Sequence, residues 1–285
     1  MSGQRQLSRT ALGTAHLRAL HRLRDARPLI LDDPVAAALL GPELMQRLDA
    51  AEARRSAQEA AILRAHVVLR SRYAEDRLAL AVARGVDQYV ILGAGLDTFA
   101  LRQPAWAGGL TIFEVDQPAS QAFKRQRIAR AGLHPPANLR WVAIDFERES
   151  LRDGLARGGV ALDRPAFFAW LGVTMYLNQA AIAAVLGAVA SFPAGSEMVL
   201  TFQQPPQAAP AADVDAASPL SERVAGLGEP FVSFFTTAAM ANLLQASGFR
   251  ELEFLTPAQS RRRYFDQRPA DLPAPPRTAI VAAQV

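Results

Sequence analysis

The 285-residue sequence contains no cysteine. Disulfide bonds, thiolate zinc sites and cysteine nucleophiles are therefore excluded, and the composition is compatible with a reducing compartment such as the cytoplasm. Long apolar runs are missing as well, since none approaches the roughly 18 residues that a membrane-spanning helix needs. The first residues, MSGQRQLSRTALG, also lack the apolar segment of a secretory signal. We therefore expect a cytoplasmic protein without a membrane partner.

The excess of charge is small, at +4 from 31 basic and 27 acidic side chains. A nucleic-acid-binding protein usually gathers a basic excess on one face of its fold. The only tight basic cluster is Arg261 to Arg263, and such a short run is typical of a solvated loop. We therefore expect no nucleic-acid partner, while the sequence gives no indication of the oligomeric state.

The order of patterns along the chain indicates an α/β protein. Residues 1–84 have helical patterns, including a segment that begins near Pro34, with Asp32 and Asp33 as candidate caps, and breaks at Gly41-Pro42. From residue 88 onward, short apolar runs alternate with stretches long enough for helices. The runs cover 88–93, 110–115, 139–144, 166–171 and 198–202, and two intervening stretches, 118–131 and 178–190, are candidate helices. This alternation predicts a doubly wound parallel sheet.

The last third of the chain has a different pattern. Residues 203–230 are rich in Pro, Ala and Gly and lack apolar periodicity, which indicates either a lid or a disordered insert. A helix over 236–247 follows, and then two strand candidates over 249–255 and 278–283 that predict a terminal antiparallel pair. We therefore expect an N-terminal helical cap over 1–84, packed on an α/β core over 85–285.

A glycine-rich turn follows the first predicted strand. Gly93 and Gly95 let the backbone approach a ligand closely, because glycine has no Cβ and tolerates positive φ. The third glycine of a dinucleotide-binding turn is replaced by Thr98, and the carboxylate of Asp97 would repel a phosphate. An aminoacyl group with an ammonium would instead be attracted to Asp97.

Acidic side chains follow the next two predicted strands. Glu114 and Asp116 lie on one side of their strand by alternation, and one of them is enough to accept hydrogen bonds from ribose hydroxyls. After the third strand, Asp145 can accept from an adenine amino group while the ring of Phe146 packs against the base. Acidic residues at strand ends also serve as turn formers and helix caps, so each position has a structural alternative.

One basic residue interrupts an apolar helix face. Arg70 follows Leu63 and Val67 at helical spacing, and a guanidinium there is costly unless an anion pairs with it. A ligand carboxylate is one candidate, because arginine can bind it through two hydrogen bonds. The alternative is an internal ion pair with Asp76 or with a carboxylate of the core.

The motifs together resemble a known family. Residues 90–98 (VILGAGLDT), 113–118 (FEVDQP) and 172–177 (GVTMYL), together with the RSR and DF motifs at Arg70 and Asp145, resemble the leucine carboxyl methyltransferase family. The similarity is greatest to the bacterial branch that includes polyketide O-methyltransferases. It implies a class I methyltransferase fold, with five parallel strands plus a terminal antiparallel pair, and S-adenosyl-L-methionine as cofactor.

The resemblance also implies roles for single residues. Arg70 would bind the cofactor carboxylate, Gly93 the methionine part and Asp116 the ribose, while Asp145 and Phe146 would flank the adenine. Many members of the family have a glutamate just before the GVTMYL segment, where this chain has Trp170-Leu171. If that glutamate contacts the cofactor amine, Asp97 or a backbone group has to take its place here.

The expected reaction is methyl transfer to an oxygen of a small-molecule acceptor, either a carboxylate or a hydroxyl, with a polyketide or another secondary metabolite as a possible class. Tyr176 follows the fourth strand and is our candidate for the acceptor pocket, with a packing role as the alternative. We assign catalysis to none of the four histidines, and we expect no metal. Two other functions remain open: a nicotinamide-dependent oxidoreductase, and a protein that binds the cofactor without catalysis.

Overall fold

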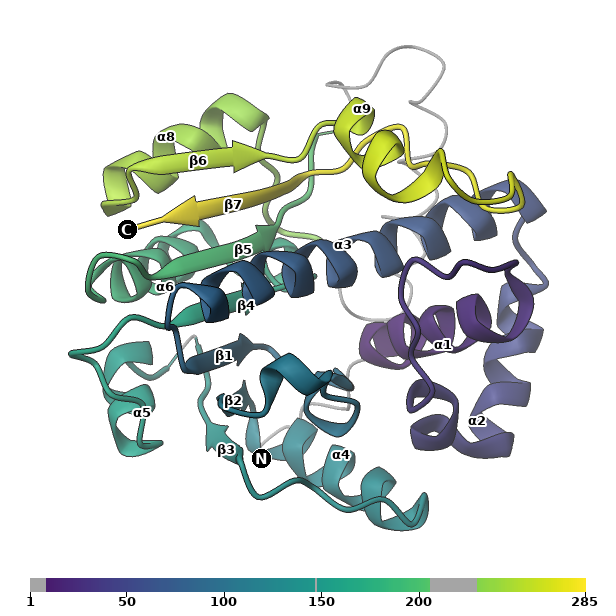
Figure 1. Cartoon of the computed structure of the whole chain (residues 1–285), viewed down its shortest axis with the longest axis horizontal. Coiled ribbons are helices and arrows are strands. Elements are labelled where there is room, and N and C mark those ends of the chain that lie inside the picture. The colour runs from purple at the N-terminus through teal and green to yellow at the C-terminus, as the bar shows by residue number, and fades with distance from the viewer. Residues whose placement is uncertain (1–8, 147, 206–229) are drawn as a thin grey trace.

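A single mixed sheet organises the chain. The computed structural model describes residues 9–146, 148–205 and 230–285. Its seven strands are β1 (Gln88–Leu92), β2 (Thr111–Asp116), β3 (Leu139–Ala143), β4 (Phe167–Trp170), β5 (Glu197–Thr201), β6 (Glu251–Phe254) and β7 (Ile280–Gln284). They lie in the order β3-β2-β1-β4-β5-β7-β6 (Figure 1). The first five are parallel, and β7 is antiparallel to both of its neighbours. The predicted class I methyltransferase plan is confirmed.

The helices are α1 (Arg9–Arg24), α2 (Ala36–Glu52), α3 (Ala57–Ala83), α4 (Pro118–Arg130), α5 (Leu151–Arg157), α6 (Gln179–Ala190), α8 (Thr237–Ser247) and α9 (Pro257–Ser260), with short helical turns η1 (Phe99–Leu101), η2 (Ala105–Ala107), η3 (Thr174–Tyr176) and η5 (Arg261–Phe265). Their ends follow from local chemistry. The Asn178 side chain caps α6, and Gly248, with φ of 111°, ends α8. Ser56 and Glu59 form a capping box that begins α3.

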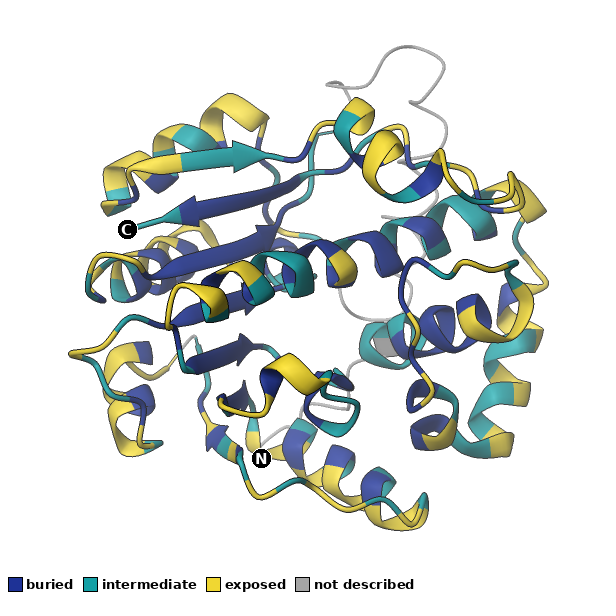
Figure 2. Cartoon of the chain, in the orientation of Figure 1, coloured by how far each residue is buried: buried dark blue, intermediate teal, exposed yellow. Residues whose placement is uncertain are grey.

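Alternation along each strand divides the core between the two faces of the sheet. On β1, Val90 and Leu92 join a hydrophobic cluster with α5, α6 and α8, whereas Tyr89 and Ile91 join a second cluster with α3. The central strands β1, β4 and β5 are buried along their whole length, and β6 at the edge is partly exposed (Figure 2). Burial on both faces explains why the central strands are almost continuously apolar in sequence.

Three helices precede the sheet, as expected for residues 1–84. Helix α3 lies across one face of the sheet and contacts α1, which in turn packs against α2 (Figure 1). The division into a cap over 1–84 and a core over 85–285 stays a prediction. At the start of α2, Asp33 Oδ1 accepts hydrogen bonds from the backbone N–H groups of Val35 and Ala36 at 3.1 and 3.0 Å. Asp32 instead pairs with Arg22 at 2.8 Å.

The predicted break at Gly41-Pro42 is confirmed. Gly41 has a non-helical backbone with φ of 67°, so α2 consists of two helical pieces joined by a kink, and the second piece runs to Glu52. The basic run Arg261 to Arg263 is exposed, but it lies in the π-helical turn η5 and not in the expected loop. Most of the predicted lid or insert, residues 206–229, lies outside the described residues. No helix in the described ranges has the length and apolarity needed to cross a membrane.

Candidate active site

The turn after β1 has the backbone conformation that its glycines allow. Gly93 and Gly95 have φ of 67° and 49°, in the left-handed region that side chains other than glycine rarely adopt. A Cβ on Gly93 would lie 2.5 Å from a methyl carbon of Val173, which follows β4. The turn is thus closely packed at Gly93 against the end of β4, and a side chain at Gly93 would displace Val173.

Asp116, at the end of β2, is joined to this turn. Its Oδ2 accepts a hydrogen bond from the Gly95 N–H at 2.6 Å, and its Oδ1 accepts one from the Gln117 N–H at 2.7 Å. Burial raises the pKa of Asp116, although these two hydrogen bonds act in the opposite direction. The structure therefore brings together two of the predicted cofactor-binding residues.

Glu114 lies in a different environment, although it is only two residues away. Its Oε2 pairs with Lys124 Nζ of α4 at 2.6 Å, and both side chains are only 1% exposed. Burial raises the pKa of Glu114 to about 7, while the charge of Lys124 lowers it. Its other oxygen, Oε1, is buried without a hydrogen-bond partner in the described structure. Glu114 therefore joins β2 to α4, and its predicted contact with the cofactor stays a prediction.

Arg70 of α3 has the surroundings of an anion-binding group. It is half-buried, and within the described part of the chain no carboxylate or carbonyl pairs with it. The alternative partner Asp76 pairs with Arg72 instead, at 2.7 Å. Burial and the charge of Arg18 lower the pKa of Arg70 to about 10, whereas Tyr176 and Asp97 raise it. The guanidinium of Arg70 is therefore destabilised as a cation in this structure, and an anionic ligand would relieve that cost.

Gly172, at the end of β4, makes room for this guanidinium. A Cβ on Gly172 would lie 2.7 and 2.8 Å from the two terminal nitrogens of Arg70, and φ of Gly172 is 74°. The sequence shows Gly172 only as part of a family motif and does not predict this contact. Its signal is a glycine directly after a buried strand, where a close approach of another group is common.

The remaining predicted residues lie at the ends of β1, β3 and β4. Asp97 Oδ1 accepts a hydrogen bond from the Phe99 N–H at 2.8 Å. Asp145 is half-buried, with Arg148 at 3.8 Å, and Phe146 packs against the cluster shared by α5, α6 and α8. Because the carboxyl ends of parallel strands meet at one edge of a sheet, these residues lie at the same edge as Gly93, Asp116 and Gly172.

Tyr176 lies in η3, at the beginning of an aromatic row. Its ring is 5.5 Å from that of Phe231 in an edge-to-face arrangement, and Phe231 is 6.4 Å from Phe234. Backbone hydrogen bonds from Val232 and Ser233 to the Met175 carbonyl hold the two segments together. Sequence reasoning misses Phe231 and Phe234, because nothing local indicates that residues 231–234 return to β4.

In the ranges that the structure describes, no group of three or more His, Asp or Glu side chains could hold a metal ion.

Comparison with known proteins identifies the family. The leucine carboxyl methyltransferase pattern matches residues 11–190, which is more than half of the chain. YktD of Bacillus subtilis, named as an S-adenosyl-L-methionine-dependent methyltransferase, is 31% identical over 288 aligned positions that cover 94% of each chain. The chain belongs to the leucine carboxyl methyltransferase family of S-adenosyl-L-methionine-dependent methyltransferases. It is accordingly a methyltransferase enzyme, and S-adenosyl-L-methionine is its cofactor.

Other similarities agree with this assignment. A methyltransferase of the same description from Mycobacterium avium is 36% identical over 202 residues, covering 67% of this chain and 66% of its own. Among solved structures, a DUF574 family protein from Streptomyces avermitilis has a TM-score of 0.58 at 17% identity, covering 98% and 97% of the two chains. A methyltransferase from Thermobifida fusca has a TM-score of 0.57 at 17% identity, covering 87% and 91%. These two structures show the fold. Membership of the methyltransferase family excludes the two alternative functions, a nicotinamide-dependent oxidoreductase and a cofactor-binding protein without catalysis.

Proposed function

We propose that this methyltransferase transfers the methyl group to an oxygen of a small-molecule acceptor. The acceptor class is a carboxylate or hydroxyl compound, such as a polyketide or another secondary metabolite, and not a nucleic acid. The family description names a carboxyl group as the acceptor of its type member, which favours a carboxylate. The cytoplasm remains the proposed compartment, and the cysteine-free sequence is compatible with it.

The observation that supports the cofactor site in this proposal is the guanidinium of Arg70 beside Gly172, which pairs with no described carboxylate. Within the described residues no carboxylate forms an ion pair with this half-buried cation, Asp97 acts on it only through its charge, and the cofactor offers a carboxylate. We assign the ribose to Asp116, the methionine part to Gly93 and Gly95, and the cofactor amine to Asp97. We also propose that Asp145 and Phe146 flank the adenine, following the resemblance of their motif.

The cofactor supplies an electrophilic methyl group on a sulfonium, and the protein has to align an oxygen with it and exclude water. The C–S bond breaks as the C–O bond forms. A carboxylate acceptor has no proton to lose, whereas a hydroxyl acceptor has to release one. Tyr176 and the aromatic row beside it are our candidates for the wall of the acceptor pocket, where they would fix an apolar acceptor body.

The histidines give little support for a general base. Burial and the charge of Arg70 lower the pKa of His66 to about 3, so His66 is neutral and weakly basic at pH 7. His16 lies 3.0 Å from Asp49, and His21 lies 2.7 Å from Asp25 while accepting hydrogen bonds from backbone N–H groups. His134 is exposed. This pattern favours an acceptor that is already nucleophilic, which again points to a carboxylate.

Calorimetry with S-adenosylhomocysteine and transfer from methyl-labelled S-adenosylmethionine test the proposal. The wild-type chain should bind S-adenosylhomocysteine, and Asp116→Ala should bind it at least about tenfold more weakly. Transfer is then measured to panels of carboxylic acids, phenols, amines and thiols. A labelled product that releases methanol in mild base is an ester, whereas an ether resists the same treatment. Transfer to amines or thiols alone would reject the oxygen acceptor, and normal binding by Asp116→Ala would reject the site.

A further inference from the structure

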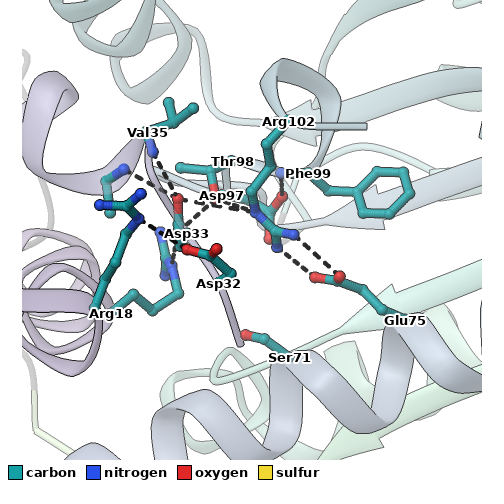
Figure 3. Close-up of polar contacts among 12 residues, drawn as sticks. Arg18, Asp32, Asp33, Val35, Ser71, Glu75, Asp97, Thr98, Phe99 and Arg102 are labelled. Atoms are coloured by element: carbon teal, nitrogen blue, oxygen red, sulfur yellow. Dashed lines mark hydrogen bonds and ion pairs between the residues drawn. The ribbon is translucent and has the colours of Figure 1, made fainter. Parts of the chain in front are cut away.

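Asp33 is a buried carboxylate at the centre of a polar network that joins the N-terminal helices to the turn after β1. Its side chain is 0% exposed. While Oδ1 caps α2, Oδ2 accepts hydrogen bonds from Arg18 Nε at 2.9 Å and from Thr98 Oγ1 at 2.7 Å (Figure 3). One oxygen thus serves the helix start and the other faces the turn.

The turn is held on this side by two of its own residues. The Thr98 hydroxyl donates to Asp33, and the Leu96 carbonyl accepts a hydrogen bond from Arg18 at 2.6 Å. On its other side, the Gly95 N–H donates to Asp116. The turn that the cofactor is proposed to contact is therefore tied to β2 on one side and to the N-terminal helices on the other.

The network continues to the helix that carries Arg70. Arg102 Nε donates to the Thr98 hydroxyl at 3.0 Å, and its two terminal nitrogens pair with both oxygens of Glu75 on α3 (Figure 3). Two carboxylates and two guanidiniums are involved, so the network carries no net charge. Burial alone would raise the pKa of Asp33, but the charges of Arg18 and Arg102 hold it below its usual value, which keeps Asp33 ionised as an acceptor.

The side chain of Thr98 also holds the turn in place. In sequence it occupies the place of the third glycine of a dinucleotide-binding turn. In the structure it is 1% exposed, and its hydroxyl both donates to Asp33 and accepts from Arg102. Thr98, which distinguishes this turn from a dinucleotide-binding turn, is thus also the side chain that bonds the turn to Asp33 and Arg102.

We propose that Asp33 is a positioning residue, which holds the 93–98 turn in its cofactor-binding shape through Thr98 and Arg18. The inference rests on the proposed function, because it takes this turn as part of the cofactor site. It assigns to the N-terminal helices a part in forming a site whose motif lies about 60 residues further along the chain.

Asp33→Asn separates this role from helix capping. Asparagine caps a helix about as well as aspartate, so the hydrogen bonds from Val35 and Ala36 can persist. Its amide nitrogen cannot accept from Thr98 or Arg18. Thr98→Val keeps the shape of the side chain and removes the hydroxyl, whereas Thr98→Ser keeps the hydroxyl. Asp32→Asn is the matched control, because Asp32 is the exposed neighbour that pairs only with Arg22 among the contacts described.

Two readouts are needed on the full chain: calorimetry with S-adenosylhomocysteine, and hydrogen exchange of the backbone over residues 93–99. We expect Asp33→Asn and Thr98→Val to bind S-adenosylhomocysteine about 10- to 100-fold more weakly, and to exchange at least about fivefold faster in this segment than wild type. Thr98→Ser and Asp32→Asn should stay within about twofold of wild type in both measurements.

The inference is overturned if Asp33→Asn and Thr98→Val bind normally, if exchange over 93–99 is unchanged, or if Thr98→Ser is as weak as Thr98→Val. Faster exchange throughout the chain together with a lower melting temperature would show a general structural role, and would overturn it too. Should Asp33→Asn fail to fold, Thr98→Val decides by the same criteria. If the wild-type chain itself does not bind S-adenosylhomocysteine, the proposed site fails and this inference fails with it. That outcome is distinct from normal binding by both wild type and the variants.

Discussion

Replacement of Arg70 by methionine should have opposite effects on stability and on cofactor binding. The free protein holds a half-buried guanidinium that forms no ion pair with a carboxylate among the described residues. Its pKa falls from its usual value to about 10, mainly through burial. At about 1.4 kcal/mol per pKa unit, the charged form costs on the order of 3 kcal/mol at neutral pH. Methionine has a similar length, no charge and an adaptable apolar body.

Arg70→Met should therefore raise the free energy of unfolding by about 1–3 kcal/mol, where about 3 kcal/mol is the ceiling set by the pKa. The melting temperature should rise by about 2–4 °C for each kcal/mol. Binding of S-adenosylhomocysteine should weaken by about 100-fold or more, because a two-point hydrogen bond between charged groups is lost. Urea unfolding followed by circular dichroism gives the first quantity, and calorimetry gives the second.

Arg72→Met is the matched control on the same helix. Arg72 is 46% exposed and paired with Asp76, so its loss should change stability by less than about 1 kcal/mol and leave the affinity for S-adenosylhomocysteine within about twofold. The reasoning is refuted if Arg70→Met lowers the free energy of unfolding, or if it binds S-adenosylhomocysteine as tightly as wild type. The first result would mean that Arg70 is a structural cation, and the second that it does not bind the cofactor carboxylate.

Three further predictions concern neighbouring elements. Gly172→Ala places a Cβ 2.7 Å from a terminal nitrogen of Arg70 at a positive φ. We expect about tenfold weaker binding of S-adenosylhomocysteine by calorimetry and a free energy of unfolding about 1–2 kcal/mol lower in urea. Unchanged binding would contradict the contact between Gly172 and Arg70. Burial raises the pKa of Glu114 to about 7, so the folded protein binds this proton more tightly than the unfolded chain between about pH 4.5 and pH 7. Stability from this group is therefore present at low pH and lost as the pH rises through 7, by at most about 3 kcal/mol. Glu114→Gln should remove that slope in urea unfolding at pH 5 and pH 8, and equal slopes for both proteins would count against it. Ser56→Ala removes the capping box of α3 and should cost about 1 kcal/mol in the same assay without changing calorimetric binding, whereas weaker binding would connect the start of α3 with the site.

Much of the fold follows from patterns that are local in the sequence. The apolar runs around Val90 and Phe168 predict buried strands, because a strand covered on both faces needs apolar residues at nearly every position. The terminal antiparallel pair follows from two strand candidates joined by a connection too irregular for a crossover helix. The break at Gly41-Pro42 also follows from the local sequence, because glycine readily adopts the positive φ of 67° found there and proline has no backbone N–H to donate.

For the candidate site, the sequence predicted which residues lie at the strand ends better than which groups those residues bond to. Glu114 and Asp116 share one side of β2, and no local pattern tells which carboxylate is free to meet a ligand. Lys124 on α4 pairs with Glu114, and the Gly95 N–H bonds to Asp116. Arg70 posed the same question, because Asp76 was an equally reasonable partner until the structure placed Asp76 on Arg72. Such choices depend on which helix covers which strand.

By itself, the sequence determined the doubly wound sheet, the glycine turn and the family, because periodicity, turn chemistry and short motifs act over a few residues. Only the tertiary structure decided that Asp33 and Thr98, which are 65 positions apart, share a hydrogen bond, and that Arg70 lies against Gly172. Those contacts arise when helices from the first third of the chain pack against a sheet whose strands come later in the sequence. Buried charges then pair with whichever groups the packing brings close to them. No local sequence pattern encodes which groups these are.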